Sequence, residues 1–560
     1  SEPTWTNGTQ APPADDDTSP EATITGISST TTLRAGAFKI GWQPTNIDTQ
    51  TYIFLADVLA QPANPAGWPT NWDPSGGAAD YEMVSGLHSG PAMTAALMDI
   101  PTLSLVMDQD DLFHPDYGIY SNPGLRDMAG ERKVSMELIN PDGSDGFQID
   151  AGIRIQGMTG RGRAKRSFRV IFRGHLYGEG KLRYPLFADS PVDSFDQLIL
   201  RAGVNDSYTD WRRGQYIRDG WTNQTYRDMG QEALYGNFVH LYVNGLYWGL
   251  YNPIERPNAA WAASHMGGER DADWDASKGT AESNGHDIAY DIMMDISKGT
   301  SSFGPISTPG AYAELLTYAN VEAVADYAIL NFYTATGDWR DSTNTEWVRK
   351  REDDAGYLPV VWDAENTLEY NVDANVTGTT AYPAALHRRL LANPDYRILV
   401  ADRIHQHFFN GGALTIAANQ ARYAALAEEI QLAIKAEEAR WADNPGHSYK
   451  FTYANWTTER NRIINDHFAQ REPIAMDQYK NSTNFTHPMY PDVDAPEFNQ
   501  HGGQVASGFA LTITSSEGTI YYTLDGTDPR LTGTESGLIS PAALVYSAPV
   551  SLTDTTHVMA

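Results

Sequence analysis

The chain has 560 residues, of which 41% are hydrophobic, and it carries 40 basic against 71 acidic side chains, for a net charge of −31. At about 100–200 residues per domain, this length predicts three or four domains. The negative field repels a nucleic-acid backbone and argues against a general nucleic-acid role. The sequence has no cysteine, which excludes a disulfide scaffold, an iron–sulfur cluster, a cysteine-based zinc site and a cysteine nucleophile.

No apolar run approaches the roughly 20 residues that a membrane helix needs. The longest, Ala323–Phe332, is interrupted by Asp326 and Asn331. The first residues, Ser1–Thr6, lack the basic and apolar parts of a signal peptide and resemble a mature end after its removal. We therefore expect a secreted or cell-surface protein, of bacterial origin, without a membrane span.

The beginning of the chain is predicted to be extended and then β-rich. Residues 1–22 are rich in proline, aspartate and threonine and predict a flexible leader. A β-rich region follows over 23–100, with its clearest strand patterns at Ala22–Ile27 and Phe38–Trp42. A helix is expected at Gly90–Met98.

A β-rich lobe is expected over 101–309. Its clearest signal is Asn244-Gly245 between two alternating apolar strands, Phe238–Val243 and Leu246–Tyr251. Such a pair favours a tight hairpin turn, because both turn residues need a positive φ. The lobe's other expected elements are the strands Thr102–Met107, Val134–Ile139, Gln148–Ile155 and Phe168–Phe172 and a helix over Asp210–Met229.

Helical periodicity dominates residues 310–485 and predicts a helical lobe. Its expected helices are Ala311–Thr334, Asp395–Phe409 and Ala417–Asp443, with a short β interval at Glu346–Arg349 and Tyr357–Trp362. Pro394, Pro445 and Pro473 are expected to mark helix boundaries. A linker over 486–504 and a small β unit over 505–560 complete the chain.

A basic cluster interrupts the acidic sequence around the glycine-rich turn Gly157–Arg163. Its members are Arg154, Arg161, Arg163, Lys165, Arg166, Arg169 and Arg173, with no acid among them. The backbone N–H groups of such a turn, with a following lysine, can hold triphosphate oxygens. An equal alternative is a solvated hairpin whose charges pair with acids elsewhere.

An acidic group follows two predicted elements of the helical lobe. Asp338, Asp341 and Asn344 follow a helix, and Asp363 and Glu365 follow a strand. Mg²⁺ takes hard oxygen ligands and keeps several waters, so two or three such side chains suffice. The arrangement resembles a base and a metal site for phosphoryl transfer. The plainer alternative is a set of turn and cap residues.

Three further candidates are weaker. Glu255 follows the predicted hairpin and could orient a lysine, contact a nucleotide or form a surface salt bridge. His405 and His407 lie two apart on a predicted helix and so do not share a face, which argues against a zinc pair. The run Asp271–Asp275 resembles a calcium loop but lacks the glycine and distal glutamate of an EF-hand, so Ca²⁺ is a minor expectation.

These segments, in this order, resemble the CotH kinase family over about residues 101–409. The resemblance rests on Ala151–Gly157, Lys165–Phe172, Leu198–Asp206, Phe238–Glu255, Asn331–Asp338 and Pro359–Glu365. Residues 505–560, with Gly518–Pro529, are similar to the chitobiase/β-hexosaminidase C-terminal β-sandwich module. The chain stops at Ala560, where such a module has another strand, and this predicts a longer full-length protein.

The resemblance implies an α+β multidomain protein. Its centre would be a divergent two-lobed protein-kinase-like domain, with a β-rich N-lobe and a helical C-lobe, flanked by small β-rich modules. It also implies binding of ATP with Mg²⁺ or Mn²⁺ and transfer of phosphate to Ser or Thr of extracellular or surface proteins.

Roles carried over from the family fall on five residues of the basic turn, the hairpin and the acidic group. Lys165, with Gly160 and Arg163 beside it, would meet the phosphates, and Glu255 would support the nucleotide. Asp338 would accept the substrate proton.

The implied metal site departs from the family's pattern. Asp363 would hold the metal together with an asparagine that precedes an aromatic residue. If Trp347 is that aromatic residue, Glu346 takes the place of the asparagine and Asn344 is displaced. This departure makes a pseudokinase a real alternative to an active enzyme.

Two function hypotheses follow, with a third behind them. The first is a secreted kinase acting on surface proteins. The second is a structural or adhesive surface protein, forming filaments with neighbouring copies, in which a degenerate kinase-like fold is a scaffold. A β-sandwich that lacks a strand presents an open edge that another chain can fill. The third, carbohydrate binding or cleavage, is prompted only by the C-terminal module, which lacks a recognisable carboxylate pair.

Overall fold

The computed structural model describes residues 3, 9, 23–72, 78–210, 212–278, 281–339, 344–352, 355–380, 383–444, 449–533 and 537–560. The expected leader over 1–22 therefore lies outside the described residues, apart from positions 3 and 9. So do Pro445 and Asp341. Within the described residues, no helix combines the length and apolar character that crossing a membrane requires.

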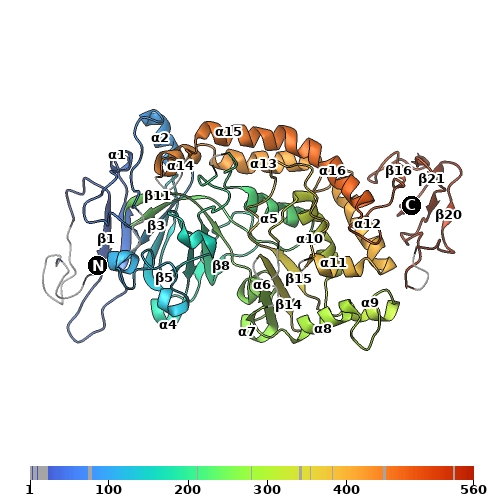
Figure 1. The fold of residues 1–560 in the computed structure, drawn as a ribbon, viewed down its shortest axis with the longest axis horizontal. Coiled ribbons are helices and arrows are strands. Elements are labelled where there is room, and N and C mark those ends of the chain that lie inside the picture. The colour runs from blue at the N-terminus through green and yellow to red at the C-terminus, as the bar shows by residue number, and fades with distance from the viewer. Residues whose placement is uncertain are drawn as a thin grey trace. The chain divides into compact units, whose positions relative to one another are not determined.

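The chain forms two compact units, each built from separate segments. The first unit comprises Ser1–Gln224, Leu234–Gly267 and Ala421–Ile464. The second comprises Thr225–Ala233, Gly268–Gln420 and Asn465–Ala560. The protein is thus a mixed α/β multidomain structure, with a large sheet in the first unit and helices in both units (Figure 1).

A closed β-barrel forms the centre of the first unit (Figure 1). In barrel order its strands are β10 (Val239–Val243), β11 (Leu246–Ile254), β9 (Gln197–Arg201), β6 (Phe168–Ile171), β5 (Phe147–Ile155), β4 (Arg132–Ile139) and β3 (Thr102–Val106). Neighbouring strands pair antiparallel, except that β3 and β10 run parallel and close the barrel. The strands predicted in this lobe are confirmed.

The hairpin between β10 and β11 has the predicted turn. Asn244 has a φ of 47° and Gly245 a φ of 84°, the positive values that a tight primed turn requires. The Asn244 side chain also accepts a hydrogen bond from Met107 N at 2.8 Å. This bond links the turn to the end of β3, the strand that pairs with β10 to close the barrel.

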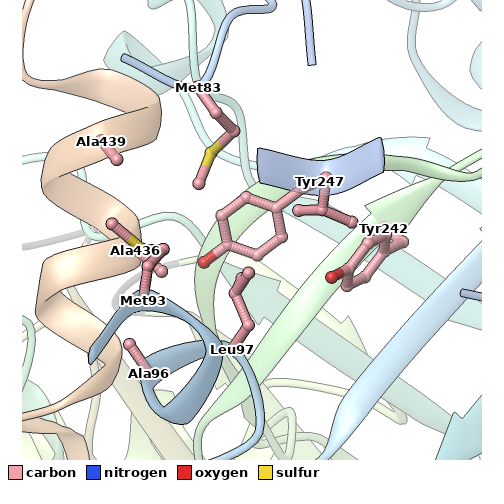
Figure 2. Close-up of a cluster of buried hydrophobic side chains, with 9 residues drawn as sticks. Met83, Met93, Ala96, Leu97, Tyr242, Tyr247, Ala436 and Ala439 are labelled. Carbon is pink, nitrogen blue, oxygen red and sulfur yellow. The ribbon is translucent and has the colours of Figure 1, made fainter. Parts of the chain in front are cut away.

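Helix α14 (Ala433–Trp441) packs against this hairpin through an apolar cluster. Ala436 and Ala439 of α14 meet Met93, Leu97 of α2 (Gly90–Leu97) and Tyr247 of β11. Figure 2 shows the Tyr247 ring pointing between the two helices. Because alanines face the cluster, the helix backbone can approach the barrel closely, which brings Glu437 next to β11.

A four-stranded antiparallel sheet and a set of helices form the second unit (Figure 1). The strands, in sheet order, are β13 (Ala281–Asn284), β12 (Trp274–Lys278), β14 (Thr345–Lys350) and β15 (Leu358–Val361). Helix α10 (Val321–Thr334) is buried along nearly its whole length. Around it lie α11 (Ala384–Leu390), α12 (Pro394–Phe408) and α16 (Phe468–Asn481).

The C-terminal β unit consists of short strands paired two by two. They are β16 (Glu497–Phe498), β17 (Phe509–Leu511), β18 (Ile513–Thr514), β19 (Tyr521–Tyr522), β20 (Leu544–Val545) and β21 (Val550–Leu552). Arg530 of this unit forms a two-pronged ion pair with Asp402 of α12, at 3.0 and 2.8 Å. The C-terminal β unit leaves large apolar side chains exposed, among them Leu544 and Val545 of β20.

Two strand predictions near the start of the chain are wrong. The strands there are β1 (Thr31–Ala35) and β2 (Asp48–Tyr52), whereas residues 23–30 have no strand and Phe38–Trp42 forms a turn. Gly41 has a φ of 81°, which turns the chain where an alternating pattern predicted extension. The pattern misled because no sheet face buries its apolar residues.

The helix predicted over Asp210–Met229 begins late, as α5 (Arg218–Asp228). The buried Asp206 carboxylate accepts hydrogen bonds from Gln215 N at 2.8 Å and Arg218 N at 3.0 Å. These bonds hold the preceding residues in a loop.

The long helix predicted over Ala311–Thr334 is divided into α9 (Pro309–Leu315) and α10. Asn320 caps α10 by accepting a hydrogen bond from Ala323 N at 3.0 Å, which starts a new helix. Likewise, Ala417–Asp443 forms two helices, α13 (Ile416–Ile430) and α14.

Pro394 opens α12 as predicted, but the boundary predicted at Pro473 is wrong. Pro473 lies inside α16, and a π-helical turn over Ile463–His467 joins α16 to α15 (Tyr453–Arg462). Pro473 cannot donate the backbone hydrogen bond that a helix needs at this residue. The π-helical turn lies just before this position in the chain.

Candidate functional site

Lys165 of the basic cluster lies inside the first unit, just before β6. Its side chain is 1% exposed, and Nζ donates to Glu437 Oε1 and to Leu250 O, each at 2.6 Å. The rings of Tyr216 and Tyr251 flank the ammonium group, with centroids 5.2 and 4.8 Å away. Burial lowers the pKa of Lys165 to about 8, and the Glu437 carboxylate only partly offsets this.

The partner carboxylate is held in place by three donors. Besides Lys165, Glu437 accepts from Tyr216 Oη at 2.7 Å and from Leu250 N at 2.6 Å. Burial and the Glu437 carboxylate raise the pKa of Tyr216, so its hydroxyl stays protonated and donates. These three donors satisfy the hydrogen-bonding capacity of the buried carboxylate in place of water.

Gly249 allows α14 to approach β11. A Cβ at this residue, whose φ is 113°, would lie 2.6 Å from both Glu437 Oε2 and Trp441 Nε1. Side chains of α14 then bond the backbone of β11, as Trp441 Nε1 donates to Trp248 O at 2.8 Å and Arg440 Nε to Tyr247 O at 3.1 Å. The helix thus satisfies polar groups along this stretch of the strand.

Most of the basic cluster is used inside the fold. Arg154 and Arg173 both pair with the buried Glu131, at 2.6 and 3.1 Å. Although burial opposes it, hydrogen bonds from Tyr177 and Arg154 lower the pKa of Glu131. The charge-pairing alternative therefore accounts for these two arginines.

The remaining arginines differ in their surroundings. Arg161 donates to Gly157 O and Pro123 O, each at 2.6 Å, and Arg166 donates to Arg163 O at 2.9 Å. Arg169 donates to Gln197 Oε1 at 2.7 Å. Arg163 itself is exposed at the end of the turn, so its side chain is open to a ligand.

Gly160 is buried in a 3₁₀ turn, Thr159–Gly162. A Cβ there would lie 2.6 Å from Val204 Cγ2, so the glycine is needed for packing against Val204. This close approach explains why a glycine stands at position 160. The contact of Gly160 with a nucleotide stays a prediction.

Glu255, at the end of the hairpin, is 2% exposed. Its carboxylate bonds His265 Nε2 at 2.7 Å, Tyr235 N at 2.9 Å and Trp261 Nε1 at 3.1 Å. The surface salt bridge considered for Glu255 is therefore wrong, and the glutamate that orients Lys165 is Glu437 instead. The nucleotide contact of Glu255 stays a prediction.

Asp338 lies in the second unit, three residues after Ala335, which caps the C-terminal end of α10 with a φ of 54°. Two asparagines hold it: Asn366 Nδ2 donates to Asp338 Oδ2 at 2.9 Å, and Asn344 Nδ2 donates to Asp338 O at 2.9 Å. The structure thus brings Asp338 and Asn344 together and adds Asn366, which the sequence reasoning missed.

Asp363 lies at the same end of the sheet as Asn344. Thr345 pairs with Val361, so Asn344 and Asp363 extend from neighbouring strand ends. Asp363 has a φ of 60°, a left-handed value that is uncommon for a residue other than glycine and that tends to occur at functional sites.

Glu346, the other candidate for the asparagine position, has a different environment. It lies within β14, is 5% exposed, and its Oε1 is 3.4 Å from Lys278 Nζ. Lys278 Nζ also lies 5.9 Å from the ring centroid of Trp362. Glu346 is therefore engaged with a cation, whereas Asn344 contacts the candidate base.

The donor set at this end of the sheet suits a hard cation. Asp338, Asp363 and Asn344 offer carboxylate and amide oxygens, and Mg²⁺ or Mn²⁺ bound to a nucleotide draws its other ligands from phosphate and water. Within the described ranges, no group of three or more His, Asp or Glu side chains is placed to hold a metal ion by itself.

The described acids of the calcium-like run already have protein partners. Asp273 Oδ2 accepts from Glu269 N at 2.7 Å, and Asp275 Oδ1 pairs with Arg351 Nε at 2.7 Å. The side chain of Asp271 lies outside the described residues. His405 and His407 contact different groups, Tyr490 Oη at 3.1 Å and Asp326 Oδ1 at 3.0 Å.

A family model matches most of the region that holds the candidate residues. The model of the family "CotH kinase protein" matches residues 153–474, which is more than half of the chain. The chain belongs to the CotH kinase protein family. All eight positions of this CotH protein that the sequence predicted for the site, from Gly160 to Asp363, fall within that match, and so does Glu437.

The C-terminal module of the CotH chain matches a second family model. This model, "Fn3 associated", covers residues 509–560, which confirms a β-rich module at this position. No curated protein matches the chain.

The sequence reasoning missed Glu437 and Asn366. Glu437 lies in an alanine-rich helix far from Lys165 in the sequence, and no local pattern distinguishes it from a solvated glutamate. Asn366 could have been found, since it follows the segment Val361–Glu365 directly.

Proposed function

We propose that this CotH protein is a secreted kinase that transfers phosphate from ATP to Ser or Thr of extracellular or surface proteins. The observation that supports it best is the hydrogen bond from Asn366 to Asp338, 2.9 Å long. It fixes a carboxylate beside the turn that carries Asp363. A candidate base next to a candidate metal ligand is the arrangement that phosphoryl transfer needs.

In the proposed reaction, the hydroxyl oxygen of the substrate forms a bond to the γ-phosphorus of ATP, and Asp338 accepts the hydroxyl proton. The bond from that phosphorus to the bridging oxygen breaks, and ADP leaves. Asp363 and Asn344 would hold Mg²⁺ or Mn²⁺, which neutralises phosphate charge when bound. Glu346 is the alternative metal ligand if it, and not Asn344, occupies the asparagine position of the family.

Lys165 is the proposed phosphate ligand, with the exposed Arg163 beside it. A lysine oriented by a glutamate is part of the protein-kinase constellation, and Glu437 supplies that glutamate here. Gly160 and Glu255 would line the nucleotide. Lys165 belongs to the first unit, and Asp338 and Asp363 belong to the second.

The test is phosphate transfer from labelled ATP with Mg²⁺ or Mn²⁺, compared between the wild type and Asp363→Ala. We expect transfer to a surface protein, or to the chain itself, and its loss in the variant. Asp291→Ala, which changes an exposed residue of α8 (Ile288–Lys298), is the matched control. Absence of nucleotide binding at millimolar ATP would reject the kinase.

A second function has its own support: a filament-forming or adhesive surface protein with a kinase-like scaffold. Lys165 Nζ is already occupied by protein groups. The C-terminal module, which we propose to be of the chitobiase type, has two-stranded sheets, and residues of β16, β17 and β21 line a cavity of about 1050 Å³. Open strand edges favour pairing with neighbouring copies.

This second function is tested by sedimentation and electron microscopy of the purified chain. Val545→Lys places a charge on the exposed strand β20 and should abolish fibres. Leu87→Lys, at a side chain that is 43% exposed in the first unit, should not. A chain that stays monomeric at high concentration would reject the filament.

A further inference from the structure

A group of arginines lies around β6 of the first unit. Phe168 and Val170 of this strand are buried, with 1% and 0% exposure. Because successive side chains of a strand point to opposite faces, Arg169 between them points to the other face. There it lies directly opposite Arg154 of β5, and Arg173 follows β6 two residues after its end. None of the three arginines has a role in the phosphotransfer proposal.

The buried carboxylate of Glu131 serves two of these arginines. Its Oε2 lies 2.6 Å from Arg154 Nη2, and its Oε1 lies 3.1 Å from Arg173 Nε. Tyr177 Oη donates to the same Oε1 at 2.9 Å, so both oxygens of Glu131 are occupied. Asp127 Oδ1 lies 3.6 Å from Arg154 Nη1, but this side chain is 94% exposed, and water weakens its attraction to the arginine.

Arg169 has only a neutral partner. Its Nε donates to Gln197 Oε1 at 2.7 Å. Within the part of the chain that the structure describes, Arg169 forms no ion pair, and its two terminal amino groups have no acceptor. Neither amino group is sealed from solvent. Burial, and then the charges of Arg256, Arg154 and Arg173, lower the pKa of Arg169 to about 9, so the side chain is charged at pH 7.

This arrangement is unfavourable for the folded chain alone. Like charges directly opposite each other on neighbouring strands repel, and a partly buried cation without a counter-ion loses hydration that nothing replaces. Arg154, Arg169 and Arg173 carry three positive charges against the one negative charge of Glu131, which leaves an excess of two. A doubly charged anion held by Arg169 would balance this excess.

We propose that Arg169 binds a phosphate dianion on this face of β6. The terminal amino groups of a guanidinium form a planar fork that matches two phosphate oxygens. Gln197 holds the Nε edge of the side chain and so leaves the fork for the ligand. Inorganic phosphate and a phosphorylated serine of another protein offer the same chemistry. The site does not depend on the kinase reaction, because it uses none of the residues assigned to that reaction.

Calorimetric titration of the whole chain with inorganic phosphate tests the proposal at about pH 8, where phosphate is a dianion. Phosphate is expected to bind, and acetate at the same ionic strength at least about tenfold more weakly. Arg169→Met should weaken phosphate binding at least about tenfold. Arg169→Lys keeps the charge without the fork and should weaken it severalfold. Tighter binding of N-acetylphosphoserine methylamide than of phosphate would assign the site to phosphorylated proteins, and the reverse to the free ion.

Arg183→Met is the matched control, because it removes the same charge from the first unit at a side chain that is 71% exposed. Phosphate should raise the unfolding temperature of the wild type and of this control, but not that of Arg169→Met. Should Arg169→Met fail to fold, Arg169→Lys provides the comparison, and unchanged affinity in it would reject the fork.

Four results would overturn the proposal. The first is a wild type that does not bind phosphate, and the second is equal affinity for acetate and phosphate. The third is an equal loss of phosphate binding in the Arg183 and Arg169 variants, which would reduce the effect to general charge. The fourth is a loss in Lys165→Met without a loss in Arg169→Met, which would place the anion at the candidate nucleotide site.

Discussion

The ammonium nitrogen of Lys165 lies 2.6 Å from Glu437 Oε1, and both side chains are almost completely buried. The attraction between them offsets the cost of removing two charges from water only while both are present. Replacing one partner therefore leaves an isolated buried charge.

We expect Glu437→Gln to lower the free energy of unfolding by about 3–5 kcal/mol at pH 7, measured by denaturant titration. A double variant, Lys165→Met with Glu437→Leu, should recover most of this loss. If the single variant is as stable as the wild type, the pair contributes nothing to the fold.

The same pair makes stability depend on pH. Because the folded pKa of Lys165, about 8, lies below its ordinary value of 10.5, the unfolded chain binds more protons between these values. Wild-type stability should therefore rise with pH from about 8 towards 10.5, relative to Lys165→Met. Parallel curves for the two proteins would contradict the lowered pKa.

Acid should weaken the first unit through His240. Burial lowers the pKa of His240 to about 4, below its ordinary value of 6.5, so the unfolded chain binds the extra proton. Stability should fall by up to about 3 kcal/mol as the pH drops from 6.5 to 4. His240→Phe should flatten this slope, whereas His175→Asn, at an exposed site, should leave it unchanged.

Gly249 and Gly157 give a matched pair of glycine substitutions. Both have positive φ, 113° and 98°, but only a Cβ at Gly249 would meet neighbouring atoms within 4 Å. Gly249→Ala should cost about 2–5 kcal/mol, from backbone strain and crowding, and Gly157→Ala about 1–2 kcal/mol, from strain alone. Thermal unfolding compares them, and equal costs would mean that α14 moves away freely.

Asp363 allows the roles of conformation and charge to be separated. Asp363→Gly and Asp363→Ala both remove the carboxylate, and we expect both to lose phosphate transfer. Since glycine adopts the φ of 60° without strain, Asp363→Gly should be about 1 kcal/mol more stable than Asp363→Ala. An active glycine variant would show that the carboxylate is not needed.

Local patterns predicted the local structure well. The Asn244-Gly245 turn, the barrel strands and the start of α12 at Pro394 each depend on a few adjacent residues, and each is confirmed. The wrong predictions share a cause. Whether Phe38–Trp42 lies in a sheet, and whether a helix continues through Pro473, depends on tertiary packing that the adjacent residues do not encode.

The candidate site was predicted only in part, for the same reason. Asp338 and Asn344 are close in sequence and in space. Glu437, in contrast, reaches Lys165 through the packing of Ala436 and Gly249, which involves residues from distant segments. A pattern of local spacing carries no information about such a contact.

The parallel pairing of β3 with β10 and the return of residues 421–464 to the first unit have a practical consequence. The barrel can close only after β10 has been synthesised, and α14 can pack against it only after most of the polypeptide has been synthesised. A fragment ending near residue 267 contains every barrel strand but lacks α14, so it would expose the face of the hairpin that α14 covers, and we expect it to aggregate. Expression fragments meant to isolate this half of the protein should join its three segments with short linkers.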